Sequence, residues 1–156
     1  MAGRKAFKTR IRELLASRRL FHRRQGQQLS ALVRQTIQPY FPGFDLEQIR
    51  IHSGIPWYVL MDAVAYTDRH RIYFRPGSYD EESIVGLALI AHEVTHCWQY
   101  HQLGTWRFRW RYLRDWWHHF LRSRSLTRAY FNVSFEREAR RVEQRLYEDL
   151  NRYFPA

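Results

Sequence analysis

The chain has 156 residues, of which 45% are hydrophobic and 17% aromatic, and its formal net charge is +11. This apolar content excludes a disordered or low-complexity chain, and the length fits one domain with a core of its own. A single cysteine, Cys97, excludes an internal disulfide framework. We expect Cys97 to be a small core residue.

The positive charge is concentrated in two segments. Residues 1–24 contain nine Lys or Arg residues and one acid, and residues 105–128 contain seven Arg residues and one acid. The excess charge of these segments is larger than the net charge of the chain, so the remaining residues are net negative. Either segment is a candidate for contact with an anionic membrane or with nucleic acid.

The sequence does not begin with a basic and then apolar signal segment. The longest apolar run, residues 84–91, is far shorter than the ~20 residues that cross a bilayer. We therefore expect a protein that is cytoplasmic when it is synthesised, with neither a signal peptide nor a transmembrane segment. Export by a route without a cleavable leader stays open.

The first third of the chain predicts two helices. Residues 1–27 place apolar side chains at helical spacing among many arginines, which is typical of a basic amphipathic arm. A second, short helix should follow and end at Pro39, because proline interrupts the helical hydrogen bonds. Its predicted apolar face consists of Leu29, Leu32, Val33 and Ile37.

The next segment predicts a small sheet. Residues 49–52 alternate apolar with polar side chains, which is typical of a strand. Residues 63–67 and 71–75 are β-rich runs on either side of Asp68, Arg69 and His70. We expect a hairpin with a three-residue loop at this point.

A helix is predicted to begin between residues 78 and 83 and to continue to about residue 100, with its apolar part from residue 84 onward. Ser78 and Asp80 are the two candidate N-caps, each followed by acidic residues at favourable positions. The helix is apolar almost all round, so we expect it to lie in the core.

Two further helices are predicted. Residues 106–124 combine aromatic residues with arginines at helical spacing, and we expect the apolar side of this helix to complete the core. Contact of the same helix with a membrane or with nucleic acid remains an alternative. The last helix should begin near Ser134, and its core stripe is Phe135, Ala139, Val142, Leu146 and Leu150.

The motif that carries chemistry lies inside the predicted buried helix. His92 and His96 are one helical turn apart, so both imidazoles can face one metal ion. Glu93 can take a proton from a water molecule as it attacks a carbonyl carbon. Buried imidazoles and a buried carboxylate are costly unless they are paired or bound to a metal, so the motif indicates a catalytic zinc site.

A catalytic zinc ion usually has three protein ligands and one open position. The metzincin pattern would require a third His at position 102 and a Gly at position 99, and both positions are Gln. That class is excluded. Glu136 and Glu138, at the start of the last helix, are the alternative third ligands, and helical periodicity does not choose between them.

Three stretches resemble one known family. Residues 49–54, 72–79 and 89–99 are similar, in this order and spacing, to the bacterial extracellular contractile injection system core domain, which is regarded as a metallopeptidase domain. The resemblance covers the chain from about Leu29 to Tyr100. It implies a peptidase fold and an association with injection systems.

A second resemblance concerns the last helix. The segment from Phe135 to Ala139 is similar to the glutamate helix of gluzincin peptidases, in which the ligand precedes a small residue by three positions. This resemblance implies Glu136 as the third ligand and leaves Glu138 in reserve. Gluzincins commonly have an acid four residues beyond the ligand, where this chain has Arg140. Compact minigluzincins imply that a chain of this length can house such a site.

These observations predict an α+β fold. A small antiparallel sheet would pack against the active-site helix and the glutamate helix, with a basic helical extension at the N-terminus. Residues 1–27 would form the arm, and residues 28–156 a single zincin-like metallopeptidase domain. One Zn²⁺ per chain would be the cofactor.

The predicted function is zinc-dependent hydrolysis of a peptide or protein substrate. His92, His96 and Glu136 would bind the metal, and Glu93 would be the general base. Tyr130 and His101 are candidate donors to the oxyanion. The alternative is a catalytically weak or inactive module that binds an anionic membrane, nucleic acid or an injection-system partner through its basic helices. Sequence leaves the oligomeric state open.

Overall fold

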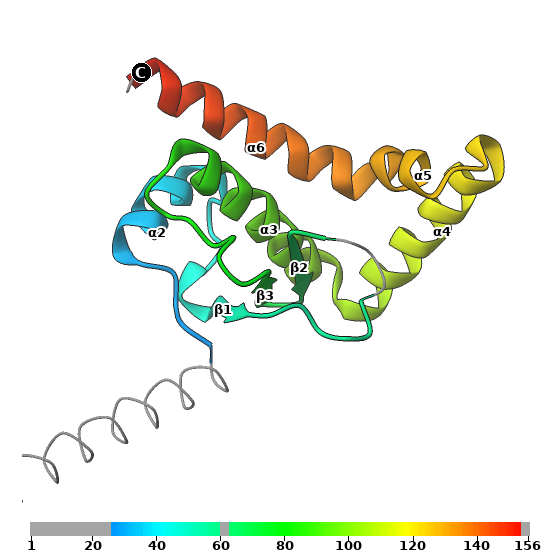
Figure 1. The fold of residues 1–156 in the computed structure, drawn as a ribbon, viewed down its shortest axis with the longest axis horizontal. Coiled ribbons are helices and arrows are strands. Elements are labelled where there is room, and N and C mark those ends of the chain that lie inside the picture. Colours follow the sequence, from blue (N-terminus) through cyan, green and yellow to red (C-terminus); the bar gives the residue numbers. More distant parts are fainter. Residues whose placement is uncertain (1–25, 60–62, 154–156) are drawn as a thin grey trace, which may run out of the picture.

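A computed structural model describes residues 26–59 and 63–153 (Figure 1). The predicted basic helix at the N-terminus therefore lies outside the described residues, except for its last two positions. The fold combines a three-stranded sheet with several helices, so the predicted α+β class is confirmed. Helix α3 lies between the sheet on one side and the long helix α6 on the other (Figure 1).

The first described helix, α2 (Ala31–Ile37), is shorter than the sequence predicts. Ser30 caps it by accepting a hydrogen bond from the Val33 amide, and Pro39 lies in the 3-10 turn η1 (Gln38–Tyr40) that ends it. Leu29, Val33 and Ile37 are buried at a spacing of four residues. The prediction for Leu32 was wrong, because this side chain lies beside that face and is 66% exposed.

The sheet is mixed rather than antiparallel throughout. After the 3-10 turn η2 (Leu46–Gln48), β1 (Arg50–Ser53) pairs with β3 (Arg71–Phe74) in parallel, and β2 (Ala65–Asp68) pairs with β3 antiparallel. The hairpin places β2 on one edge of β3. The connection from β1 to β2 then crosses the end of the sheet, so that β1 takes the other edge in the same direction as β3.

The hairpin loop has two residues instead of the predicted three. Asp68 pairs with Arg71, and Arg69 takes the left-handed conformation at φ 60° that lets the chain reverse. Thr67, Ile72 and Ile51 are aligned across the sheet and are buried against α3. The register of the strands thus places Thr67 beside the His-Glu motif.

Helix α3 (Ile84–Leu103) begins later than predicted. Ser83 is its N-cap and accepts a hydrogen bond from the Gly86 amide, so Ser78 and Asp80 are not caps. Asp80 instead accepts hydrogen bonds from the Glu82 and Ser83 amides and from the Ser83 hydroxyl. This turn occupies the residues that would have formed the first turn of a longer helix.

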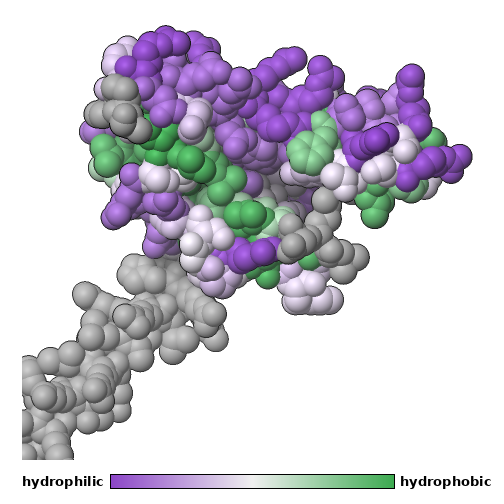
Figure 2. Space-filling view, turned by 45° about the horizontal axis from the view of Figure 1, so that its top comes forward, coloured by the Kyte–Doolittle hydropathy of each residue, from purple (hydrophilic) through white to green (hydrophobic). Residues whose placement is uncertain are grey.

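The predicted burial of α3 is confirmed. Twelve of its 20 residues are buried, among them Cys97 and the three motif residues His92, Glu93 and His96. It packs against α6 (Ser134–Tyr153), in which Phe135, Ala139 and Leu146 are buried as predicted. Hydrophilic residues cover the outer face of α6 (Figure 2).

Helix α4 (Thr105–Ser123) leads away from this core toward the short helix α5 (Leu126–Asn132). The prediction that its aromatic stripe completes the core was largely wrong. Phe108 is buried, whereas Trp106, Trp110 and Trp117 are more than half exposed. The chain reverses at Arg124, whose φ of 51° is left-handed, and α6 returns across α3. No helix among residues 26–59 and 63–153 is both long and apolar enough to cross a membrane.

Candidate metal centre

Two helices bring three metal-ligating side chains together. His92 and His96 project from one face of α3, and Glu136 projects from the first turn of α6. One ligand atom from each of the three residues lies within 4.8 Å of the others. The Glu136 carboxylate spans both rings, with His92 Nε2 at 3.5 Å from Oε2 and His96 Nε2 at 3.4 Å from Oε1.

This geometry fits a metal ion. Ligand atoms bonded tetrahedrally to one ion at ~2.0–2.1 Å are about 3.4 Å apart, close to the two separations between Nε2 and carboxylate oxygen. All three residues are at most 8% exposed. Oε2 of Glu136 is buried and has no hydrogen-bond partner in the described part of the chain. A buried carboxylate oxygen of this kind is costly unless it serves as a ligand or an ion-pair partner. The three residues can therefore hold one metal ion.

The charges at the centre are strongly coupled. Burial alone would lower the pKa of His92, but the adjacent carboxylates of Glu136 and Glu143 outweigh it and raise that pKa to about 10. Burial would raise the pKa of Glu136, but the two imidazoles hold it well below its usual range. The pKa of His96 is raised as well, against its burial, by Glu136. Without a metal the three groups thus form a buried ion-pair cluster.

Each imidazole is oriented by a partner behind it. His92 Nδ1 lies 2.8 Å from Glu143 Oε2, and His96 Nδ1 lies 2.9 Å from Gln99 Oε1. Since both partner atoms are acceptors, each Nδ1 carries the hydrogen and donates it. The Nε2 atoms are left to face the centre, which is the usual arrangement behind metal-bound histidines.

Glu138, the reserve candidate for the third ligand, lies outside the centre. Its Oε2 accepts a hydrogen bond of 2.8 Å from Gln99 Nε2, which also donates to the Phe135 carbonyl. Gln99 thereby links His96 to the start of α6. Of the two acids between which periodicity could not choose, Glu136 is the one that lies beside both imidazoles.

Glu93 lies next to the centre and is 6% exposed. Its Oε2 accepts a hydrogen bond of 2.7 Å from the Thr67 hydroxyl on β2. This contact fixes one carboxylate oxygen. Glu93, both histidines and Glu136 all line one cavity.

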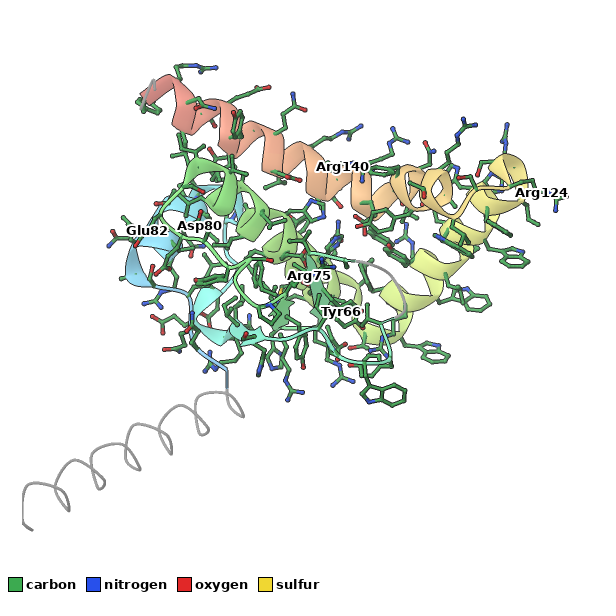
Figure 3. All side chains as sticks on the ribbon, in the orientation of Figure 1. Tyr66, Arg75, Asp80, Glu82, Arg124 and Arg140 are labelled. Atoms are coloured by element: carbon green, nitrogen blue, oxygen red, sulfur yellow. The ribbon has the colours of Figure 1, made fainter. Side chains whose placement is uncertain are left out.

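The cavity has a volume of about 670 Å³, and its walls are mainly apolar and aromatic. Strand β2 contributes Tyr66, and α6 contributes Arg140 from the opposite side (Figure 3). This volume lies in the range of pockets that admit small molecules or short peptide segments. The motif therefore lies in the wall of a cavity that can admit such a molecule.

Of the two candidate oxyanion donors, one lies at the cavity. Tyr130 lines it, and burial together with Glu136 raises the pKa of its hydroxyl. His101 is exposed and its ring contacts Phe44, at 5.3 Å between centroids. Only the Tyr130 hydroxyl therefore remains a candidate.

Sequence reasoning missed three residues of the site. Glu143 contacts His92 although this chain lacks the acid that gluzincins commonly have four residues beyond the ligand, and its spacing of seven residues from Glu136, two helical turns, was a usable signal. Tyr112 donates a hydrogen bond of 2.9 Å to Glu136 Oε1. Thr67 and Tyr112 come from elements distant in the chain, so no local spacing pointed to them.

Residues 28–104 match the model of the eCIS core domain, that is, the core domain of the extracellular contractile injection system. The matched stretch contains the sheet, α3 and the His-Glu motif, and it ends before Glu136. The resemblance noted in the sequence is confirmed for this domain. Searches of the curated proteins and of the solved structures find no match.

Proposed function

We propose that this chain, which carries an eCIS core domain at residues 28–104, is a zinc-dependent metallopeptidase. The observation that supports this proposal best is the position of the Glu136 carboxylate, which lies 3.5 and 3.4 Å from the Nε2 atoms of His92 and His96. We assign these three residues to the metal and Glu93 to proton transfer.

Zinc is the metal that this donor set favours. Two imidazoles and one carboxylate are a ligand set of catalytic zinc sites, in which a fourth position stays open. The cavity of about 670 Å³ borders all three ligands. A bound zinc ion would supply Lewis acidity, which polarises a carbonyl and makes water a better nucleophile.

Glu93 is suited to the role of general base. Its carboxylate lines the cavity beside the ligands, and the Thr67 hydroxyl holds one of its oxygens at 2.7 Å. The other oxygen can then take the proton of the attacking water and deliver it to the leaving amine. Peptide hydrolysis needs both transfers, and one carboxylate can perform them in sequence.

The eCIS core domain supports a role in an injection system, with a protein of that system as substrate or partner. The aromatic and apolar walls of the cavity suit an extended peptide segment with apolar side chains.

The decisive experiment compares the full chain with Glu93→Gln on a panel of unfolded proteins. Both forms should contain one zinc ion, and turnover should fall by ~10²–10⁴ in the variant, as expected when a general base is removed. Glu82→Gln, a change of an exposed glutamate outside α3, is the matched control. Equal cleavage by wild type and Glu93→Gln would point to a contaminating protease, and wild-type protein without stoichiometric metal would remove the proposal.

A further inference from the structure

Helix α4 has a second apolar face that is largely exposed in the described part of the chain. Its inner face carries Phe108 and Tyr112 onto Phe135 of α6. Its outer face carries a row that we name the α4 stripe, with exposed fractions of 48% to 81%. The stripe consists of Trp106, Trp110, Leu113, Trp117 and Leu121.

The stripe is continuous rather than scattered. At ~100° per residue its five positions fall within an arc of about 80° and extend over about 22 Å of helix. Single exposed apolar residues are ordinary on a protein surface, but a contiguous row marks an interaction site. Aromatic side chains project from the side of α4 that faces away from α5 and α6 (Figure 3).

Positive charge borders the stripe. Arg107 and Arg114 are exposed and follow it along one side, and Arg124 lies at the far end of the helix (Figure 3). The one acid of α4, Asp115, points to the inner side, where it accepts a hydrogen bond from the Ser134 amide. The outer side of α4 is therefore apolar along its centre and cationic at its margin.

Charge restricts what can cover this surface. A second copy packed on the stripe would bring two sets of arginines together, and residues 1–24 of this chain are themselves strongly basic. Duplex nucleic acid would satisfy the arginines but would offer no apolar surface to Leu113 and Leu121. An anionic bilayer offers acyl chains and phosphate groups at the same interface.

We propose that the α4 stripe is a membrane-contacting surface that places α4 in the plane of an anionic phospholipid bilayer. Tryptophan favours this interface, because its ring is apolar and its N–H can still reach polar headgroups. The marginal arginines contact lipid phosphates, for which the planar guanidinium is well suited. This surface does not include the metal centre, so the proposal stands independently of peptide hydrolysis.

The test uses the full chain and two kinds of vesicle. We expect wild-type protein to float with vesicles of phosphatidylcholine and phosphatidylglycerol in equal parts, with a blue shift of its tryptophan fluorescence. Binding to pure phosphatidylcholine should be at least about tenfold weaker, because headgroup attraction is lost. Wild-type protein that floats with neither vesicle overturns the proposal.

The stripe itself is tested by Trp110→Ser combined with Trp117→Ser. This double variant should bind the anionic vesicles about tenfold or more weakly, since two interfacial side chains are removed. The matched control is Leu32→Ser with Tyr153→Ser, which removes two exposed apolar residues from α2 and from the end of α6. Both variants should keep the circular dichroism of the wild type. If the two variants bind alike, the stripe is not the contact surface.

Two further experiments distinguish a bilayer from nucleic acid and from a second copy of the chain. Arg107→Gln with Arg114→Gln should weaken binding to anionic vesicles and reduce its dependence on salt. Mixed-sequence duplex DNA should bind the wild type and the Trp110→Ser, Trp117→Ser variant equally. A stripe-dependent affinity for the duplex, or stripe-dependent dimerisation in sedimentation without binding to vesicles, would overturn the proposal.

Discussion

Helices α3 and α4 follow each other with only Gly104 between them, have nearly the same length, and break the ordinary rule of burial in opposite ways. Helix α3 buries polar groups, namely His92, Glu93 and His96, whereas α4 exposes tryptophans. Burial of polar groups is costly unless they are paired, and exposure of a contiguous apolar row forgoes the free energy of burial. Each departure therefore supports one of the two proposals, a metal ion at α3 and an anionic bilayer at α4.

The largest expected effect is a loss of metal binding at the buried polar residues of α3. Glu136→Ala should remove stoichiometric zinc, since a tetrahedral site that loses one of its three protein ligands loses most of its affinity, more than about a hundredfold. Glu138→Ala is the control, because this carboxylate contacts Gln99 and not the imidazoles. Metal content after dialysis decides the question. Loss of metal from Glu138→Ala and not from Glu136→Ala would reverse the assignment.

The two faces of α4 should differ sharply in their contribution to stability. Phe108 is 5% exposed, and its ring lies 4.0 Å from that of Tyr100 between centroids, so Phe108→Ala should lower the free energy of unfolding by ~3–4 kcal/mol. Trp110→Ala on the outer face should change it by less than ~0.5 kcal/mol. Urea unfolding of both variants measures the difference. Equal losses would mean that the outer face is packed in the folded protein.

Loss of the contact between Glu143 and His92 should lower metal affinity less than loss of a ligand. Glu143→Ala removes the acceptor of the His92 Nδ1 hydrogen, and we expect metal affinity to fall by ~10- to 100-fold. The metal affinity of Glu143→Gln should lie between those of Glu143→Ala and the wild type, because an amide oxygen can accept the hydrogen but carries no charge. Glu148→Ala on the same helix is the control, and competition with a zinc-binding dye measures all three. An unchanged affinity in Glu143→Ala would show that the α3 centre does not depend on this contact.

The smallest predicted effect lies at the beginning of α3. A Cβ atom at Gly86 would lie 2.1 Å from the Asp80 carbonyl oxygen, so Gly86→Ala should cost ~1–2 kcal/mol despite the higher helix propensity of alanine. Val85→Ala, at a neighbouring position that is 67% exposed, should be nearly neutral. The midpoint of thermal unfolding, compared between the two variants, tests whether Gly86 is packed closely against the turn at Asp80. A stable Gly86→Ala would refute that packing.

Much of α3 could be predicted from sequence, because its signals are local. The apolar composition around His92 and His96 predicts burial, and the spacing of the two residues predicts a shared face. The predicted position of the N-cap was wrong by three residues or more. Asp80 and Ser83 belong to the same turn, and the close contact of Gly86 with Asp80 accompanies a helix that begins after Ser83. Local capping residues do not reveal such a contact.

The sequence of α4 allowed two outcomes that only tertiary structure could separate. Its aromatic residues form two stripes on one helix, and either could have faced the core. Contacts of Phe108 and Tyr112 with Phe135 selected the inner one, which left Trp106, Trp110 and Trp117 outside. A helix of this composition carries more apolar surface than one packed side can bury.

Local patterns in the sequence were enough to predict the α+β class, the burial of the helix that carries His92 and His96, and the two candidate acids for a third ligand. Tertiary structure decided that Glu136 lies beside the imidazoles, that Glu143 and Thr67 support the site, and that β1 runs parallel to β3. The difference arises from the distance along the chain between the residues that interact. Caps, turns and helical faces depend on residues a few positions apart, whereas the relative placement of α3, α6 and the sheet depends on how distant apolar surfaces pack.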